Sequence, residues 1–426
     1  MSAYNVLVVG SGGREHAIAW KIAQSPSLRN LYCLPGNPGT AQIAVNIPGK
    51  ATDKEAVAAA VEQNAIDLVV VGPEQPLVEG LVDYLKAKFP KLLVAGPSAE
   101  GAQLEGSKEF AKDFMQKYGI PTARYRAFTG ETLDEACAFL EEMRPPYVLK
   151  ADGLAAGKGV LIIDDIEEAR AELKEMFGGK FGNAGSKVVI EQYLSGIEVS
   201  VFVLTDGTDY LILPEAKDYK RIGNGDTGLN TGGMGSVSPV PFADKAFMQK
   251  VEERIIRPTV KGIAAENIDY KGFIFIGLMN CAGDPYVIEY NVRMGDPETE
   301  SVMTRIDSDL LQHLAATASG TLKDEKIEIS GKTAVTVVMV SGGYPEKYKS
   351  LYPISGIGDV KKAQVFHAGT AMSGSEVVTS GGRVLAVTAN ADSIKNAKEA
   401  AYKAVGCISF KDCYNRSDIA DDLLAL

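Results

Sequence analysis

The sequence is poor in cysteine, and the cysteines that it has are scattered. There are five, an odd number, and only Cys407 and Cys413 are near neighbours, with no histidine beside them. Scattered thiols are typical of a reducing compartment, and a close pair without histidine argues against a structural zinc site. We therefore expect reduced thiols and a cytoplasmic protein.

Long hydrophobic runs and export signals are missing as well. The chain enters a strand-like run, Asn5–Val9, almost at once, without the basic start and apolar stretch of a signal peptide. The most apolar window elsewhere, Gly272–Met279, is far shorter than the about 20 residues that a membrane-spanning helix requires. We expect no membrane partner.

An excess of positive charge is also absent. Lysine and arginine number 44 against 55 aspartates and glutamates, a formal net charge of -11. This charge opposes the counterion release that drives proteins onto nucleic acid. It does not exclude small anions, because glycine loops, lysines and magnesium also bind phosphate inside acidic proteins. We expect small-molecule partners and no nucleic acid.

Short apolar runs alternate with helical stretches through the first quarter of the chain. The expected strands are Val6–Val9, Leu31–Leu34, Leu68–Val71 and Leu92–Ala95, and the expected helices include Ala56–Gln63 and Leu77–Lys88. Such βα units predict a parallel sheet with ligands at the carboxyl ends of its strands. Further strands are expected at Val160–Ile163, Val188–Glu191, Glu198–Leu204, Tyr210–Pro214, Gly272–Met279, Tyr286–Tyr290, Thr333–Val340, Val365–Ala368 and Arg383–Thr388.

Changes in pattern divide the rest of the chain. A helical stretch stops before Pro121, and a strand, glycine loop, strand and helix pattern starts at Tyr147. Ala216–Pro241 reads as one long loop, a length that is usually functional or disordered. We expect an α/β and α+β multidomain protein with an N-terminal Rossmann-like domain at 1–104, a linker helix region at 105–122, a small subdomain at 123–194, a large subdomain at 195–330 and a mostly β C-terminal domain at 331–426.

The first glycine loop, Gly10–His16, follows a predicted strand and precedes a predicted helix. It is similar to a dinucleotide-binding fingerprint, but Glu15 replaces the third glycine, and the second strand ends at Pro35 without the expected ribose-binding acid. A Rossmann oxidoreductase is therefore disfavoured. Two interpretations remain: Gly12 and Gly13 bind a small anion through backbone amides, or they only permit a tight turn.

A second glycine loop, residues 150–159, lies between two predicted strands and has a lysine at each end. It is not a phosphate-binding loop of the Walker type. Three residues separate Gly153 from Gly157 where that motif needs four, and Gly159 follows Lys158 where it needs Ser or Thr. A mobile flap over ATP phosphates fits better.

Glu289, Asn291 and Arg293 alternate along a predicted strand, so their side chains share one face. A carboxylate and an amide oxygen suit Mg²⁺, and the guanidinium suits a carboxylate or phosphate. The alternative is the polar face of an edge strand. Asp296 and Pro297 read as the N-cap and first residue of a helix.

The glycine-rich stretch 218–235 allows either disorder or binding. Lys220 and Arg221 supply positive charge, and Asn230–Gly235 offers unobstructed backbone amides. Val188–Glu198, by contrast, is an ordinary strand and turn when taken alone.

Taken together and in this order, these segments resemble the phosphoribosylamine–glycine ligase family of the ATP-grasp superfamily. The resemblance runs from VLVVGSGGREHA to GGRVLAVTA, and its most specific parts are LKADGLAAGKGV, NTGGMGS and NVRMGDPETE. It implies a preATP-grasp domain, a two-part ATP-grasp region and a C-terminal domain. It further implies a monomer of purine biosynthesis that uses ATP and Mg²⁺ or Mn²⁺, with glycine and 5-phosphoribosylamine as substrates.

The resemblance also implies residue roles. ATP would contact Lys108, Lys150, Gly153, Gly157, Lys158, Gly159, Glu191, Leu194 and Glu198. The substrates would lie among Gly12, Gly13, Asp218, Lys220, Gly232, Gly233, Arg293, Gly295, Asp296, Pro297 and Glu298. Glu289 and Asn291 would hold the metal, and Arg293, Lys150 and Lys220 would stabilise charge during catalysis. The sequence departs from the family pattern at Gln192, Tyr219, Leu229 and Met294.

The implied chemistry proceeds through glycyl phosphate, with ADP, phosphate and glycinamide ribonucleotide as products. Because an acyl phosphate hydrolyses easily, we expect the flap and the 218–235 stretch to exclude water and to be mobile without nucleotide. Two other functions stay open: an ATP-grasp ligase with a different acid or amine, such as a carboxylase-like relative, and a regulatory nucleotide-binding protein without turnover.

Overall fold

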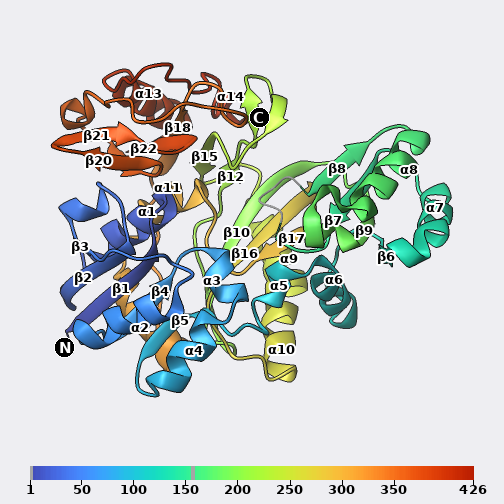
Figure 1. Ribbon diagram of the computed structural model, residues 1–426, viewed down its shortest axis with the longest axis horizontal. Coiled ribbons are helices and arrows are strands. Elements are labelled where there is room, and N and C mark those ends of the chain that lie inside the picture. The colour runs from blue at the N-terminus through green and yellow to red at the C-terminus, as the bar shows by residue number, and fades with distance from the viewer. Residues whose placement is uncertain (1–2, 155–158) are drawn as a thin grey trace.

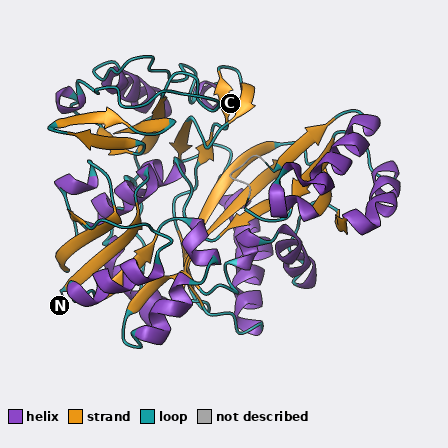
Figure 2. Cartoon of the chain, in the orientation of Figure 1, coloured by secondary structure: helices purple, strands orange, loops and turns teal. Residues whose placement is uncertain are grey.

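A computed structural model describes residues 3–154 and 159–426 of the chain, and Figures 1 and 2 show their arrangement. Within these residues, nine strands form one sheet in the order β11-β10-β16-β5-β4-β1-β2-β3, with β17 paired to β16. A five-stranded sheet, a four-stranded sheet and two hairpins complete the β structure of the same residues. No helix in this part of the chain is both long and apolar enough to cross a membrane.

The N-terminal part of the large sheet is parallel, as predicted. Its strands are β1 (Tyr4–Gly10), β2 (Leu28–Pro35), β3 (Val45–Asn46), β4 (Leu68–Val71) and β5 (Leu93–Pro97). The helices are α1 (Gly13–Ile22), α2 (Lys54–Gln63), α3 (Glu74–Val78) and α4 (Leu81–Lys88). The predicted single helix Leu77–Lys88 is wrong, because Gly80 adopts a left-handed φ of +79° and separates α3 from α4.

The same sheet continues into antiparallel strands from the middle of the chain. These are β10 (Ile197–Thr205), β11 (Tyr210–Ile212), β16 (Tyr270–Cys281) and β17 (Asp284–Asn291). The join is a short antiparallel pairing of Tyr270 with Pro97 and of Lys271 with Gly96. The predicted hairpin at Asp206 and Gly207 is confirmed by the pairing of β10 with β11.

A separate lobe, on the right of Figure 1, contains the four-stranded sheet. Its strands are β6 (Tyr125–Thr129), β7 (Tyr147–Ala151), β8 (Val160–Ile163) and β9 (Lys187–Gln192), in the order β6-β9-β7-β8. Helices α7 (Leu133–Glu141) and α8 (Ile166–Glu175) pack on it and share its own hydrophobic core. Between this lobe and the N-terminal part lie α5 (Gln103–Gly106), α6 (Lys108–Lys117), α9 (Lys245–Val251) and α10 (Arg257–Ala265).

The prediction of one long loop at Ala216–Pro241 is wrong. The segment contains β12 (Lys217–Asp218), β13 (Arg221–Gly223), β14 (Thr227–Asn230) and β15 (Gly235–Ser238). Strands β12 and β15 pair into the C-terminal sheet, in the order β12-β15-β18-β22-β19. The sequence pattern missed them because they are short and glycine-rich, and because the strand that completes their pairing lies about a hundred residues further on.

The C-terminal strands and helix follow the prediction closely. The observed elements are β18 (Thr333–Val340), β19 (Gln364–His367), β22 (Arg383–Ala391) and α13 (Ile394–Val405). The hairpin β20 (Thr370–Ser373) and β21 (Glu376–Thr379) and the short helix α14 (Asp421–Leu424) were not predicted. Two helices, α11 (Glu298–Met303) and α12 (Leu310–Ser319), connect the β17 region to β18, and α11 lies beside α1.

Candidate active site

Glu289, near the end of β17, lies among positive side chains. Burial would raise the pKa of its carboxyl, but nearby cations hold that pKa below its usual value. The cations are Lys220, Lys150, Lys108 and Arg293. They come from four separate segments of the chain, and all four charges act on the Glu289 carboxyl.

Arg293 and Asn291 also meet, although not as neighbours on one extended strand. β17 ends at Asn291, and Arg293 turns back so that its Nη2 donates to Asn291 Oδ1 at 2.9 Å. The same Nη2 donates to Glu105 Oε1 at 2.8 Å, and Nε lies 3.3 Å from Glu74 Oε2. Nothing in the sequence near Arg293 indicated Glu74 or Glu105, since both lie near the N-terminal sheet, far along the chain.

The oxygens of Glu289 and Asn291 suit a hard divalent cation. Asn291 is buried, and its amide nitrogen has no hydrogen-bond partner, so part of its polar group is unsatisfied. Among the described residues no cluster of three or more His, Cys, Asp or Glu could hold a metal ion. A carboxylate and an amide oxygen fit an ion of the Mg²⁺ type, which commonly takes one or two protein ligands and completes its shell with phosphate and water.

A buried ion-pair network fixes Lys150. Glu191 Oε1 lies 3.0 Å from Lys150 Nζ, and Glu191 Oε2 lies 2.9 Å from Lys112 Nζ. Burial lowers the pKa of Lys112 to about 8 although Glu191 opposes the shift, while the two lysines hold the pKa of Glu191 low. Lys150 Nζ also donates to the backbone oxygen of Ile288 at 3.2 Å, which places it beside β17. Lys112, on α6, was not predicted as a site residue, although it lies in the segment LEGSKEFAKDFM that contributes to the family resemblance.

Lys108 joins α6 to the base of the glycine flap. Its Nζ donates to the backbone oxygen of Gly153 at 2.9 Å, and its backbone N–H donates to Asp152. Gly153 has a φ of +133°, a conformation that side chains other than glycine rarely adopt. Gly157 and Lys158, with most of the predicted flap, lie outside the described residues.

The far side of the flap and the turn after β9 flank these lysines. The backbone oxygen of Gly159 accepts from the N–H of Ala151 at 2.8 Å, which closes the loop onto β7. Leu194 is half-buried in the turn between β9 and β10. Glu198, on β10, lies 2.5 Å from Lys220 Nζ. Among the described residues assigned to ATP, Lys108 contacts the base of the flap, Lys150 contacts Glu191 and β17, and Glu198 pairs with Lys220.

Asp218 and Lys220 form a second charged group beside Glu198. Burial raises the pKa of Asp218; Lys220 opposes the shift and Glu198 adds to it. For Lys220, desolvation is outweighed by the surrounding carboxylates, which hold its pKa well above the usual value. Lys220 is therefore a permanent cation at neutral pH.

The glycines of the NTGGMG segment pack against the segment that follows Arg293. A Cβ placed on Gly233, whose φ is +120°, would lie 2.4 Å from Pro297 Cδ. The backbone oxygens of Gly232 and Asp296 both accept from Arg383 Nη1, at 2.8 and 2.7 Å. Arg383 comes from β22 of the C-terminal sheet and was not predicted, so the C-terminal domain completes this side of the site.

The helix start predicted at Asp296 is wrong by one residue. α11 begins at Glu298, with Pro297 at the N-cap position. Asp296 does not cap the helix because its carboxylate lies 3.0 Å from Arg383 Nη1 and accepts from the backbone N–H of Arg14 at 3.4 Å. The Asp296 carboxylate therefore contacts Arg14 of the N-terminal domain and Arg383 of the C-terminal domain.

The first glycine loop faces this acidic segment. Gly12 N–H donates to Glu15 Oε2 at 2.6 Å, and a Cβ on Gly13 would lie 2.3 Å from Glu300 Oε1. Glu15 also fills the space that a Cβ on Gly10 or Gly72 would need. This side chain occupies the crevice where a dinucleotide would sit, which gives a structural reason to exclude the oxidoreductase.

Glu298 and Glu300, two buried residues of α11, have carboxyl groups with raised pKa values. Burial raises the pKa of Glu298 to about 7, and the charge of Asp218 adds to the shift. Glu298 Oε1 accepts from the Ser200 hydroxyl at 3.0 Å. Burial likewise raises the pKa of Glu300 well above its usual value, and neither of its oxygens has a hydrogen-bond partner among the described residues. Gly295 packs directly against the Glu298 carboxyl.

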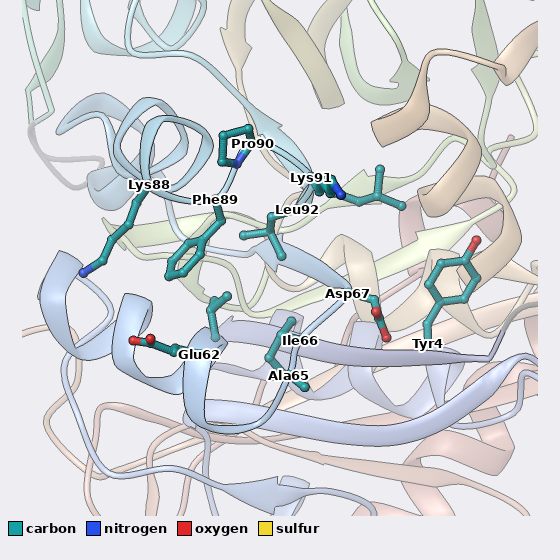
Figure 3. Close-up of a pocket in the computed structure, with 12 residues that line it drawn as sticks. Tyr4, Glu62, Ala65, Ile66, Asp67, Lys88, Phe89, Pro90, Lys91 and Leu92 are labelled. Atoms are coloured by element: carbon teal, nitrogen blue, oxygen red, sulfur yellow. The ribbon is translucent and has the colours of Figure 1, made fainter.

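A hollow at the opposite edge of the parallel sheet is a poor alternative candidate for the active site. Figure 3 shows it between Tyr4, Ile66, Asp67, Phe89 and Leu92. These residues lie at the amino ends of β1, β4 and β5, whereas ligands of parallel sheets bind at the carboxyl ends.

Three family models match successive parts of the chain. The N domain of phosphoribosylglycinamide synthetase matches residues 4–105, its ATP-grasp (A) domain 106–299 and its C domain 334–422. The chain belongs to the phosphoribosylglycinamide synthetase family. It therefore has the three-part ATP-grasp architecture of that family.

Full-length relatives agree with this assignment. A phosphoribosylamine–glycine ligase of Rhizobium meliloti is 50% identical over 97% of both chains, and one of Escherichia coli K12 is 46% identical over 97% of both. The crystal structure of phosphoribosylamine–glycine ligase from Thermotoga maritima superposes with a TM-score of 0.86 at 36% identity, covering 98% of this chain and 100% of the other. A biotin carboxylase of Campylobacter jejuni, with a TM-score of 0.73 at 16% identity over 96% of this chain and 92% of the other, shares the fold alone.

Proposed function

We propose that this phosphoribosylglycinamide synthetase family member joins glycine to 5-phosphoribosylamine at the expense of ATP, forming glycinamide ribonucleotide, ADP and phosphate in purine biosynthesis. The relatives named as phosphoribosylamine–glycine ligases span almost the whole chain. The structural observation that carries the proposal is the convergence of Lys108, Lys150, Lys220 and Arg293 on Glu289.

This convergence suits phosphoryl transfer from ATP to a carboxylate. The transition state spreads negative charge over the transferred group, and catalysis depends on cations already in place. Glu191 holds the Lys150 ammonium next to β17 in a buried network, so this cation needs little reorganisation. The resulting glycyl phosphate would then react with the amine of phosphoribosylamine.

Glu289 and Asn291 would hold the divalent ion, Mg²⁺ or Mn²⁺, which would neutralise charge on the ATP phosphates. Glu289 stays ionised because its cationic neighbours outweigh the effect of burial, as a metal ligand must. Asn291 would bind the ion through Oδ1, the atom that accepts from Arg293 Nη2 at 2.9 Å.

We place glycine near Asp218, Lys220 and Arg293, where a carboxylate can pair with its ammonium group and two cations with its carboxylate. We place phosphoribosylamine where Gly12 and Gly13 face Gly232, Gly233 and the Gly295–Glu298 segment. Arg383 reaches this second location and supplies positive charge for the sugar phosphate.

The domain division at 104, 122, 194 and 330 remains our proposal, as do a monomeric state and a cytoplasmic location. The last of these is consistent with the thiols, because all five cysteines are free.

A coupled assay tests the function. Phosphate release and glycinamide ribonucleotide formation are measured with ATP, Mg²⁺, glycine and freshly made phosphoribosylamine, and with each omitted in turn. We expect stoichiometric product only in the complete mixture. Phosphate release that needs neither glycine nor the amine would refute the proposal, and turnover with bicarbonate in place of glycine would favour a carboxylase-like ligase.

A further inference from the structure

The β13–β14 hairpin, residues 221–230, has almost no core of its own. Strand β14 is exposed along its whole length, and the side chain of Leu229 is 51% exposed. An isolated two-stranded hairpin of this size is marginally stable in water. Something outside the hairpin must therefore hold it, and Figure 1 shows it at the top of the molecule beside the C-terminus.

Arg416 supplies the central contact. It is among the largest fully buried side chains of the described residues, 1% exposed, although it belongs to an irregular segment near the end of the chain. Its Nη1 donates to Asp226 Oδ1 at 2.6 Å and to the backbone oxygen of Arg221 at 3.2 Å. Its Nε and Nη2 donate to the two oxygens of Asp418, at 2.8 and 2.7 Å.

Asp418 and its neighbours extend this contact to the turn of the hairpin. Asp418 Oδ2 accepts from the backbone N–H of Gly225 at 2.7 Å. Asn224 and Ser417 bond reciprocally, through Asn224 Nδ2 to Ser417 Oγ at 2.7 Å and Ser417 N–H to Asn224 Oδ1 at 3.1 Å. The segment 414–418, which we call the C-terminal clamp, thus bonds both the turn and the first strand of the hairpin.

The two ends of the hairpin lie at the candidate active site. Lys220 directly precedes β13, and its backbone oxygen accepts from both the N–H and the hydroxyl of Thr231, each at 2.8 Å. Thr231 leads into Gly232, which contacts Arg383. The hairpin is therefore directly continuous with Lys220 and the Gly232–Gly233 backbone, whose other side is held by the pairing of β12 with β15.

We propose that Arg416 is a positioning residue, and that the C-terminal clamp, by fixing the hairpin, keeps Lys220 and the Gly232–Gly233 backbone in place so that glycyl phosphate reacts with the amine and not with water. This inference rests on the proposed function. When the clamp is loosened, a water oxygen attacks the acyl carbon of glycyl phosphate, the bond from carbon to phosphate oxygen breaks, and glycine and phosphate leave without ligation. The consequence is ATP consumption in excess of product.

The test uses the full-length protein and three variants. Arg416→Met removes the clamp, and the double variant Asn224→Ala/Asp226→Asn weakens it from the exposed hairpin side, where misfolding is less of a risk. Lys398→Met is the matched control, because it removes an ion pair with Asp421 in the same C-terminal region without touching the hairpin. Thermal unfolding confirms that each variant is folded.

Two readouts are compared: the ratio of phosphate released to glycinamide ribonucleotide formed, and the rate of tryptic cleavage after Lys220 or Arg221. We expect the double variant and Arg416→Met to raise both several-fold, with a higher KM for phosphoribosylamine, while Lys398→Met leaves both unchanged. If cleavage is faster but the ratio of phosphate to product stays at one, the hairpin does not protect glycyl phosphate from water. If cleavage is unchanged, the C-terminal clamp does not hold the hairpin. If the wild-type protein formed no product, the proposed function would fail, yet cleavage would still test the clamp.

Discussion

The parallel N-terminal sheet and the β13–β14 hairpin are held in opposite ways. Val6, Leu7, Val8 and Val9 of β1 are completely buried, so that strand is stabilised by apolar contacts around it. The hairpin is exposed and is held by charged and polar bonds to the C-terminal clamp, nearly two hundred residues away. The first region is stabilised by its own close-packed core, and the second depends on bonds to one distant segment.

The largest effect is expected at Glu289, on β17 of the same large sheet. Glu289→Ala should lower Mg²⁺-dependent turnover by about 10²-fold to 10³-fold or more, because it removes a proposed metal ligand from among four cations. Phosphate release and thermal unfolding are measured together, with exposed Glu253→Ala as the control. Near-normal activity would remove Glu289 from the metal site.

A cavity in the core of the N-terminal sheet should lower the free energy of unfolding. Leu68, in β4, is completely buried, so Leu68→Ala should lower the free energy of unfolding by about 2–5 kcal/mol. Urea unfolding followed by circular dichroism measures this loss. A change below about 1 kcal/mol would mean that the N-terminal sheet does not act as a close-packed unit.

A smaller, pH-dependent effect is expected at Glu298, which lies between the two regions. Its pKa is raised from 4.5 to about 7, so the folded state binds the proton more tightly than the unfolded state. The contribution of Glu298 to the free energy of unfolding is therefore fully present below about pH 4.5 and is lost as the pH rises to about 7. Over this range the free energy of unfolding should fall by at most about 1.4 kcal/mol per pH unit. Unfolding midpoints at pH 5 and pH 7 should diverge less in Glu298→Gln than in the wild type; parallel changes would contradict the assignment.

The smallest effect is expected at Leu229, which is exposed whereas Leu68 is buried. Leu229→Ala, in the exposed strand of the hairpin, should change the free energy of unfolding by no more than about 0.5 kcal/mol. The same urea experiment serves as the measurement. Ile222 of β13 already packs against the main core. A loss comparable with that of Leu68→Ala would show that Leu229 also has an apolar partner.

The elements that the sequence predicted well are those with strong local signals. The apolar runs of β1, β4 and β18 are buried on both faces, and their limits match the runs within a few residues. Alternation also placed Glu289 and Asn291 on one side of β17, and the Gly-rich flap was found between two strands as expected. Strands β12 to β15 are short and polar, and the sequence pattern did not predict them. Each of these strands is stabilised by its partner strand or by the C-terminal clamp, and not by its own residues alone.

The sequence alone therefore determined the fold class, the ATP-grasp resemblance and the charged residues around Glu289, because periodicity, turns and motifs are local properties of the chain. Only the tertiary structure revealed that Glu74 and Glu105 pair with Arg293, that Lys112 shares Glu191 with Lys150, and that Arg383 and Arg416 bring the C-terminal domain to the site. None of Glu74, Glu105, Lys112, Arg383 and Arg416 was assigned a role from the sequence. Their roles arise from contacts between segments that lie far apart in the chain, and such contacts are decided by how the whole molecule packs.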